Sequence, residues 1–304
     1  MKLTRRGLVK ALAAGVLAPV AGLYSSKILL KRDSFDFAAV GDFGTDYGGN
    51  AAIVAELIKS WHPDYIITLG DNNYRRTPTD NIDWNVGALY QEYIHPYKGK
   101  FGSGSADGVN RFWPSLGNHD LDENGLVDYL DYFTLPNNGR YYDLQIGPVH
   151  LFCISTSDEP DGVTAGSVQA KWLKQRLGES NAPWKLVYGH RAPYSSGRDG
   201  GNGFLRWPYA QWGASAVISG HVHNYERLLV DDIPYFVNGL GGNQIYQTVK
   251  PNPKSLFRYT AMHGAMRISG NSKRIVFEFI NIRNQITDRH QLVQPGFWTT
   301  INNV

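Results

Sequence analysis

Five short apolar runs in this chain each end at a glycine, and an aspartate, an asparagine or a histidine follows that glycine directly. The runs with their endings are FDFAAVGD, DYIITLGD, RFWPSLGN, WKLVYGH and ASAVISGH. Short apolar runs that stop at glycine are typical of buried β-strands. The sequence therefore predicts five strands that each deliver a polar side chain at their carboxyl end.

Helical patterns lie between these runs. Ile53, Val54, Leu57 and Ile58 have the spacing of one helix face, which predicts a helix over Asn50–Trp61. Further helices are expected at Trp84–Tyr93, Gly125–Phe133, Gly166–Leu177 and Arg206–Trp212. Hairpins are expected at Arg140–Ser155, turning at Gly147-Pro148, and at Met262–Ile282, turning at Gly270-Asn271. Strands interspersed with helices indicate βαβ connections, so the expected fold class is mixed α/β.

The polar residues at the strand ends are expected to meet, because α/β sheets bind ligands beyond the carboxyl ends of their strands. They are Asp42, Asp71, Asn118 with His119, His190, and His221 with His223. Taken singly, such an aspartate could close a turn and such a histidine could be a core residue. Their repeated placement in one context favours a shared site.

Composition and charge narrow the class of protein. With 42% hydrophobic and 19% charged residues among 304, the chain belongs with ordinary globular proteins. The formal net charge is only +3, and part of the excess lies in the first 32 residues, so a nucleic-acid partner is not expected. No linker divides the remainder, and we expect one domain over residues 34–304. Cys153, the single cysteine, is expected in the core.

The N-terminus, MKLTRRGLVKALAAGVLAPVAGLYSSK, has a twin arginine, Arg5-Arg6, followed by an apolar stretch. It resembles a bacterial twin-arginine export signal, with an uncleaved membrane anchor as the alternative. Residues 1–27 are therefore kept apart from the fold. The resemblance implies the twin-arginine export machinery as a partner and a periplasmic or secreted protein, with membrane contact only through this segment.

The blocks GDFG, GDNNY, GNHD, YGH and GHVH occur in the order that is characteristic of the metallophosphoesterases, and Tyr74 within GDNNY narrows the resemblance to the purple acid phosphatases. The flanking NYER and VNGLGGN are similar to that family too. The resemblance implies the compact, single-domain bacterial type, with a central mixed β-sandwich flanked by helices in four αββα layers. It also implies a hydrolase of phosphomonoesters, an exported acid phosphatase with a small-molecule substrate.

The resemblance implies a binuclear metal centre. Its ferric ion would be held by Asp42, Asp71, Tyr74 and His223. Asp71 would bridge to a second ion, Fe(II), Zn or Mn, that Asn118, His190 and His221 also hold. The chemistry of the residues agrees, because a shared carboxylate places negative charge between two cations about 3.5 to 4 Å apart. A phenol must lose its proton to ligate, which favours a hard cation such as Fe(III).

The reaction implied is attack by metal-bound hydroxide, with His119 stabilising charge or protonating the leaving oxygen. Asp120 is expected either to orient His119 or to end a turn. Gly220 is expected to leave room for the backbone beside the site. The family usually has a further histidine nine or ten residues after the position of His190, but this chain has Arg198 and Asp199 there. Arg191 and Arg198 are therefore candidates for binding phosphate oxygens.

Two alternatives remain open from the sequence. The same metals could serve a phosphodiesterase, and relative rates on a monoester and a diester of one phenol would separate the two activities. The missing histidine also allows an exported metal- or phosphate-binding protein without catalysis.

Overall fold

A computed structural model of the chain describes residues 33–44, 49–74, 81–122, 125–157, 159–247 and 250–295. The expected export segment, residues 1–27, lies outside the described residues. Within the described ranges, no helix combines the length and the apolar character needed to cross a bilayer.

One sheet has six strands in the order β13-β12-β11-β1-β2-β3. Its parallel strands are β1 (Ser34–Val40), β2 (Tyr65–Thr68) and β3 (Phe112–Trp113). Antiparallel strands continue it on the other side of β1, namely β11 (Gly264–Asn271), β12 (Arg274–Asn281) and β13 (Ile286–Val293). The sheet is therefore mixed, and the carboxyl ends of β1, β2 and β3 share one edge.

The second sheet has seven strands in the order β10-β8-β9-β7-β6-β5-β4. Its parallel strands are β5 (Val149–Cys153), β6 (Trp184–Tyr188), β7 (Ala216–Ser219) and β9 (Ile233–Asn238). Antiparallel strands flank them, namely β4 (Tyr142–Ile146), β8 (Tyr225–Val230) and β10 (Ser255–Tyr259). This sheet is mixed as well.

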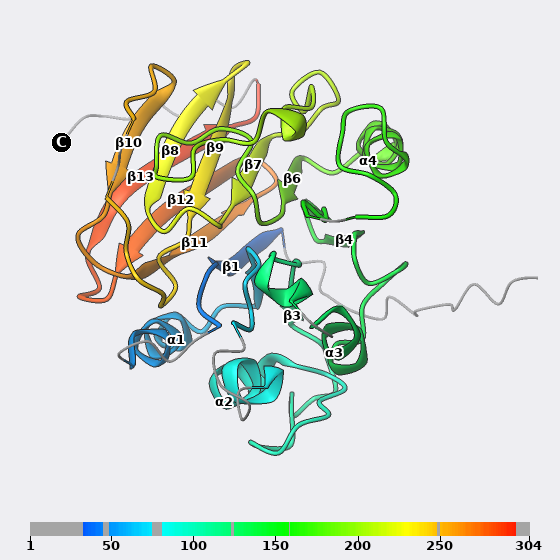
Figure 1. Cartoon of the computed structure of the whole chain (residues 1–304). Coiled ribbons are helices and arrows are strands. Elements are labelled where there is room, and N and C mark those ends of the chain that lie inside the picture. Colours follow the sequence, from blue (N-terminus) through cyan, green and yellow to red (C-terminus); the bar gives the residue numbers. More distant parts are fainter. Residues whose placement is uncertain are drawn as a thin grey trace, which may run out of the picture.

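Helices cover the outer faces of both sheets. α1 (Asn50–Ser60), α2 (Ala88–Tyr90) and α3 (Gly125–Tyr132) lie together on one side of the molecule, and α4 (Val168–Glu179) lies beside β6 away from them (Figure 1). Buried residues such as Phe37, Leu186 and Phe277 fill the space between the sheets. Separate clusters pack α1, α2 and α3 on the first sheet and α4 on the second. The expected α/β fold with a central mixed β-sandwich is confirmed.

Some expected elements differ. Arg206–Trp212 is not a helix; a 3-10 turn, Gly203–Leu205, precedes it, and Pro208 removes a helical N–H donor. The helix expected at Trp84–Tyr93 is a π turn (Asp83–Gly87), α2 and a 3-10 turn (Gln91–Tyr93) in succession. The second hairpin turns at Ser272-Lys273, because the Asn271 side chain accepts hydrogen bonds from the backbone N–H of Lys273 and Arg274.

Asp288 on β13 joins the two sheets. Its carboxylate accepts hydrogen bonds from Arg227 Nε at 2.7 Å, from Arg227 Nη2 at 3.0 Å and from Tyr225 Oη at 2.9 Å. Asp288→Ala leaves the half-buried Arg227 guanidinium without this partner, so we expect the free energy of unfolding to fall by about 2 kcal/mol in urea titrations. Arg289→Ala, which removes an exposed arginine paired with Glu278 at 3.5 Å, is the control and should cost less than about 1 kcal/mol. Equal losses in the two variants would contradict this role of Asp288.

Candidate metal centre

The two sheets direct their polar strand ends to the same place. Asp42 and Asp71 follow β1 and β2 of the first sheet, and His190 and His221 follow β6 and β7 of the second. Asp42 accepts a hydrogen bond from the backbone N–H of His221 at 2.8 Å, and His190 Nδ1 lies 2.7 Å from the carbonyl oxygen of Leu69, just before Asp71. The site therefore lies where the carboxyl ends of both sheets meet.

The backbone turns sharply at these positions. Asp42, Asp71 and His221 have φ values of 59°, 52° and 68°, in the left-handed region that non-glycine residues rarely occupy. Such strain persists where the surroundings determine it, and it is concentrated at functional sites. At Gly220 a Cβ atom would lie 2.5 Å from the Leu69 carbonyl oxygen and 2.7 Å from Asp42 Oδ2. Only glycine allows the two sheets to approach this closely there.

One set of donor atoms consists of Asp42 Oδ1, Tyr74 Oη and His223 Nε2. Each pair of these atoms is 3.3 Å apart, and all three side chains are buried. His223 Nδ1 lies 2.6 Å from the carbonyl oxygen of Gln244, which can only accept a hydrogen bond. Nδ1 therefore carries a proton and Nε2 is the ring atom directed to the set, the arrangement found in metal-ligating histidines.

A second set surrounds His190 Nε2. This atom lies 3.3 Å from Asp71 Oδ1, 3.1 Å from Asn118 Oδ1 and 3.1 Å from His221 Nδ1. Asp71, His190 and His221 each offer a ligand atom, and these atoms lie within 4.8 Å of one another. Asp71 also hydrogen-bonds Tyr74, so its carboxylate contacts both sets. The residues expected as ligands are thus brought together, with Asp71 between the two sets.

Burial and charge perturb the ionisation of these groups. Burial opposes a charge on His190, but the Asp71 carboxylate outweighs it and raises the pKa of His190 to about 9. Burial, with the charge of His190, lowers the pKa of His221 to about 3. Burial between the carboxylates of Asp71 and Asp42 raises the pKa of Tyr74 well above its usual value. A phenolate here therefore needs a strong cation beside it, and the oxygen, oxygen and nitrogen donors fit a hard metal ion.

His119 lies at the rim of the site with a half-exposed side chain. Its ring packs against Tyr74 with centroids 4.6 Å apart, and its Nδ1 lies 2.8 Å from Asp122 Oδ2. The expectation that Asp120 orients His119 is wrong. Asp120 is buried and accepts hydrogen bonds from Gly117, Asn72 and Asn73, and burial with the charge of Asp71 raises its pKa to about 7.

Asp122 is a residue that the sequence analysis missed. The 3-10 turn His119–Leu121 places Asp122 back beside His119, and the three-residue spacing in HDLD could have indicated it. The carboxylate holds the ring by Nδ1, which leaves Nε2 to face away from Asp122.

A pocket of about 490 Å³ opens over the donor sets. Its lining residues are Asp71, Tyr74, His119, Asp122, Arg198, Asp199, His221, His223, Asn243 and Tyr246. Arg198 is among them and Arg191 is not. Arg191 donates from Nε to Ser157 Oγ at 2.9 Å, and its Nη1 lies 3.1 Å from His221 Nε2. Of the two expected phosphate-binding arginines, Arg198 is therefore the one that faces the pocket.

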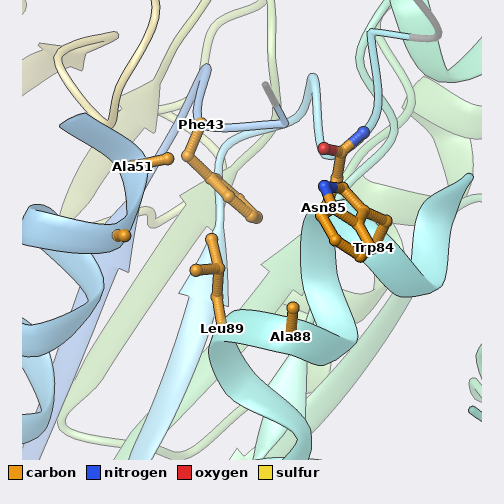
Figure 2. A pocket seen from close by; sticks show the side chains of 7 residues that line it. Phe43, Ala51, Trp84, Asn85, Ala88 and Leu89 are labelled. Atoms are coloured by element: carbon orange, nitrogen blue, oxygen red, sulfur yellow. The ribbon is translucent and has the colours of Figure 1, made fainter. Parts of the chain in front are cut away.

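A smaller hollow of about 150 Å³ lies between α1 and the turn that leads into α2. Figure 2 shows Phe43 and Ala51 on one side and Trp84, Ala88 and Leu89 on the other. Its one amide, Asn85, donates to Asn73 Oδ1 at 2.7 Å. Among the described residues, no titratable side chain lines this hollow.

A two-sheet α/β sandwich with two adjoining donor sets at the carboxyl ends of its strands defines a candidate binuclear metal protein. Residues 35–225 match the family model described as Calcineurin-like phosphoesterase, and the chain belongs to that family.

Purple acid phosphatases are among its relatives. Fe(3+)-Zn(2+) purple acid phosphatase 12 of Arabidopsis thaliana is 25% identical over 288 residues, which cover 78% of this chain and 58% of that protein. Human tartrate-resistant acid phosphatase type 5 is 23% identical, with 80% of this chain and 86% of that protein covered. The chain spans about half the length of the plant relatives it matches. The structure of purple acid phosphatase PPD1 from yellow lupin shares the fold with a TM-score of 0.69 at 16% identity, covering 86% of this chain and 54% of that one.

Proposed function

We propose that this protein hydrolyses phosphomonoesters with a ferric ion and a second divalent ion, Fe(II), Zn or Mn. The observation that carries the proposal is the pair of donor sets that share Asp71. Asp42, Tyr74 and His223 would hold the ferric ion together with Asp71. Asn118, His190 and His221 would hold the second ion with the same carboxylate. When bound, the two ions supply Lewis acidity and an acidified water as nucleophile.

Residues of the chain itself would assist the leaving group and hold the ligand rings in place. His119 faces the pocket from the rim and would protonate the leaving oxygen or stabilise charge on it. Asp122 keeps the His119 ring in place through Nδ1. The carbonyl oxygens of Leu69 and Gln244 fix the rings of His190 and His223 in the orientation that ligation needs.

Steady-state rates on the monoester phenyl phosphate and on the diester diphenyl phosphate test the proposed activity. The iron-loaded protein is expected to hydrolyse the monoester faster. A faster diester reaction would support the phosphodiesterase alternative. Metal-loaded protein that turns over neither ester would indicate a binding protein without catalysis.

Tyr74→Phe is expected to remove the visible absorption of the iron-loaded protein, because the phenolate that gives the charge-transfer band is lost. Elemental analysis and a visible spectrum of both proteins measure this, with two metal ions per chain expected in the wild type. Tyr246→Phe is the matched control, since this tyrosine also lines the pocket but stacks on His223 by its ring face. A colourless, zinc-only wild type would contradict the assignment of iron to Tyr74.

We propose further that the protein is exported by the twin-arginine machinery to the periplasm or beyond, on the evidence of Arg5-Arg6 and the apolar stretch after them. Cell fractionation of the wild type and of an Arg5→Lys, Arg6→Lys variant tests this. An equal distribution of the two proteins would overturn the proposal.

A further inference from the structure

Arg198 lines the same pocket as the rim residues His119 and Asp122. Its guanidinium lies over the Tyr246 ring, with Cζ 4.5 Å from the ring centroid. Its only ion pair to a described residue is a long one, 4.0 Å from Nε to Asp199 Oδ1, between exposed side chains. Such a pair contributes little, so the guanidinium N–H groups are available to a ligand.

The loop that carries Arg198 is held firmly. Glu226 is buried and accepts hydrogen bonds from Ser195 Oγ at 3.0 Å, Ser196 N at 2.8 Å and Ser196 Oγ at 2.6 Å. A Cβ atom at Gly197 would lie 2.2 Å from Val222 Cγ1, within the segment that carries His221 and His223. The backbone before Arg198 therefore packs directly on the ligand-bearing loop, which fixes where the Arg198 side chain begins relative to the donor sets.

Stacking sets the distance of Arg198 from the metal ligands. The rings of His223 and Tyr246 are nearly parallel, with 4.4 Å between centroids and 7° between planes, and the guanidinium covers Tyr246. The guanidinium therefore meets the ligand-bearing His223 through Tyr246, and no hydrogen bond or ion pair joins Arg198 to a donor-set residue among the described residues. The alcohol part of an ester extends away from a phosphoryl group held at the donor sets, and it is the part of the substrate that can meet a guanidinium placed beside those sets.

We propose that Arg198 binds an oxyanion on the alcohol part of the substrate, a carboxylate or a second phosphate, and thereby selects phosphomonoesters with two anionic groups. The proposal rests on the proposed phosphatase function. A guanidinium binds a carboxylate or a phosphate through two parallel N–H donors, and the stack on Tyr246 limits the motion of its plane. The exposed Asp199 gives up its long contact when the oxyanion enters.

The first test compares kcat/KM on 4-carboxyphenyl phosphate with kcat/KM on phenyl phosphate, because the ratio cancels changes that affect both esters equally. Arg198→Gln is expected to lower this ratio about five- to tenfold. A loss of this size lies between the small contribution of an exposed ion pair and the larger contribution of a hydrogen bond to a charged group. Arg198→Lys should retain part of the preference, since it keeps the charge. An unchanged ratio in Arg198→Gln would overturn the proposal.

The matched control is Arg206→Gln, because Arg206 also covers a tyrosine, Tyr194 at 4.7 Å, but does not line the pocket. It should leave the ratio unchanged, and a decrease equal to that of Arg198→Gln would overturn the proposal.

Binding of non-hydrolysable phosphonates to the metal-loaded protein gives a readout without turnover. We would measure Kd by calorimetry for benzylphosphonate, for its 4-carboxy derivative and for the derivative with a second phosphonate. The tighter of the two derivatives shows whether Arg198 prefers a carboxylate or a second phosphate. Arg198→Gln should weaken at least one of the two dianionic ligands relative to benzylphosphonate, and no relative weakening would overturn the proposal. If the wild type hydrolyses neither ester, the phosphatase function fails, while the Kd comparison still decides the role of Arg198.

Discussion

Asp71→Asn is expected to reduce kcat/KM for phenyl phosphate by about a thousandfold or more, because one substitution affects both donor sets. Asp71 lies 3.3 Å from His190 Nε2 and hydrogen-bonds Tyr74. An amide there cannot place negative charge between two cations, so their mutual repulsion is no longer offset. Elemental analysis should therefore show fewer than two metal ions per chain, in parallel with the loss of rate.

Asp199→Asn is the matched control for this prediction. Asp199 also lines the pocket, but its carboxylate is exposed and contacts Arg198 rather than the donor sets. Its metal content should equal that of the wild type. Full metal occupancy in Asp71→Asn, with activity within tenfold of the wild type, would show that Asp71 does not bridge two ions.

His119→Ala is expected to lower kcat for phenyl phosphate about a hundredfold or more, the usual contribution of a positioned proton donor. The decrease should be smaller for 4-nitrophenyl phosphate, because nitrophenolate leaves without needing a proton. His119 is not in either donor set, so metal content should be unchanged. Equal losses on both esters would indicate that His119 stabilises phosphoryl charge and does not protonate the leaving oxygen.

Asp122→Asn should change the same two rates in the same direction but less, since its carboxylate acts only through the His119 ring. Asp122 is exposed, so stability measured by urea titration should stay close to that of the wild type. A variant that unfolds more easily, with both esters affected alike, would indicate a structural role in place of a positioning one.

Local chemistry explains why much of the site could be predicted from the sequence. Apolar runs that end at glycine predict buried strands, and Asp42, Asp71, His190 and His221 follow such runs directly. The order of the five blocks then indicated the family. Elements without that pattern were missed: β8, β9 and β10 lie between Tyr225 and Tyr259, and β13 follows the hairpin expected over Met262–Ile282.

The sequence by itself determined which donor atoms stand at the strand ends, because a strand's boundaries and the residue that follows it are set by neighbours along the chain. The tertiary structure decided how those donors divide into two sets, because some of them come from each sheet and their distances depend on how the sheets pack. It also decided that Asp122 rather than Asp120 contacts His119 and that Arg198 rather than Arg191 lines the pocket. Side-chain direction depends on contacts between residues far apart in the chain, which local pattern does not encode.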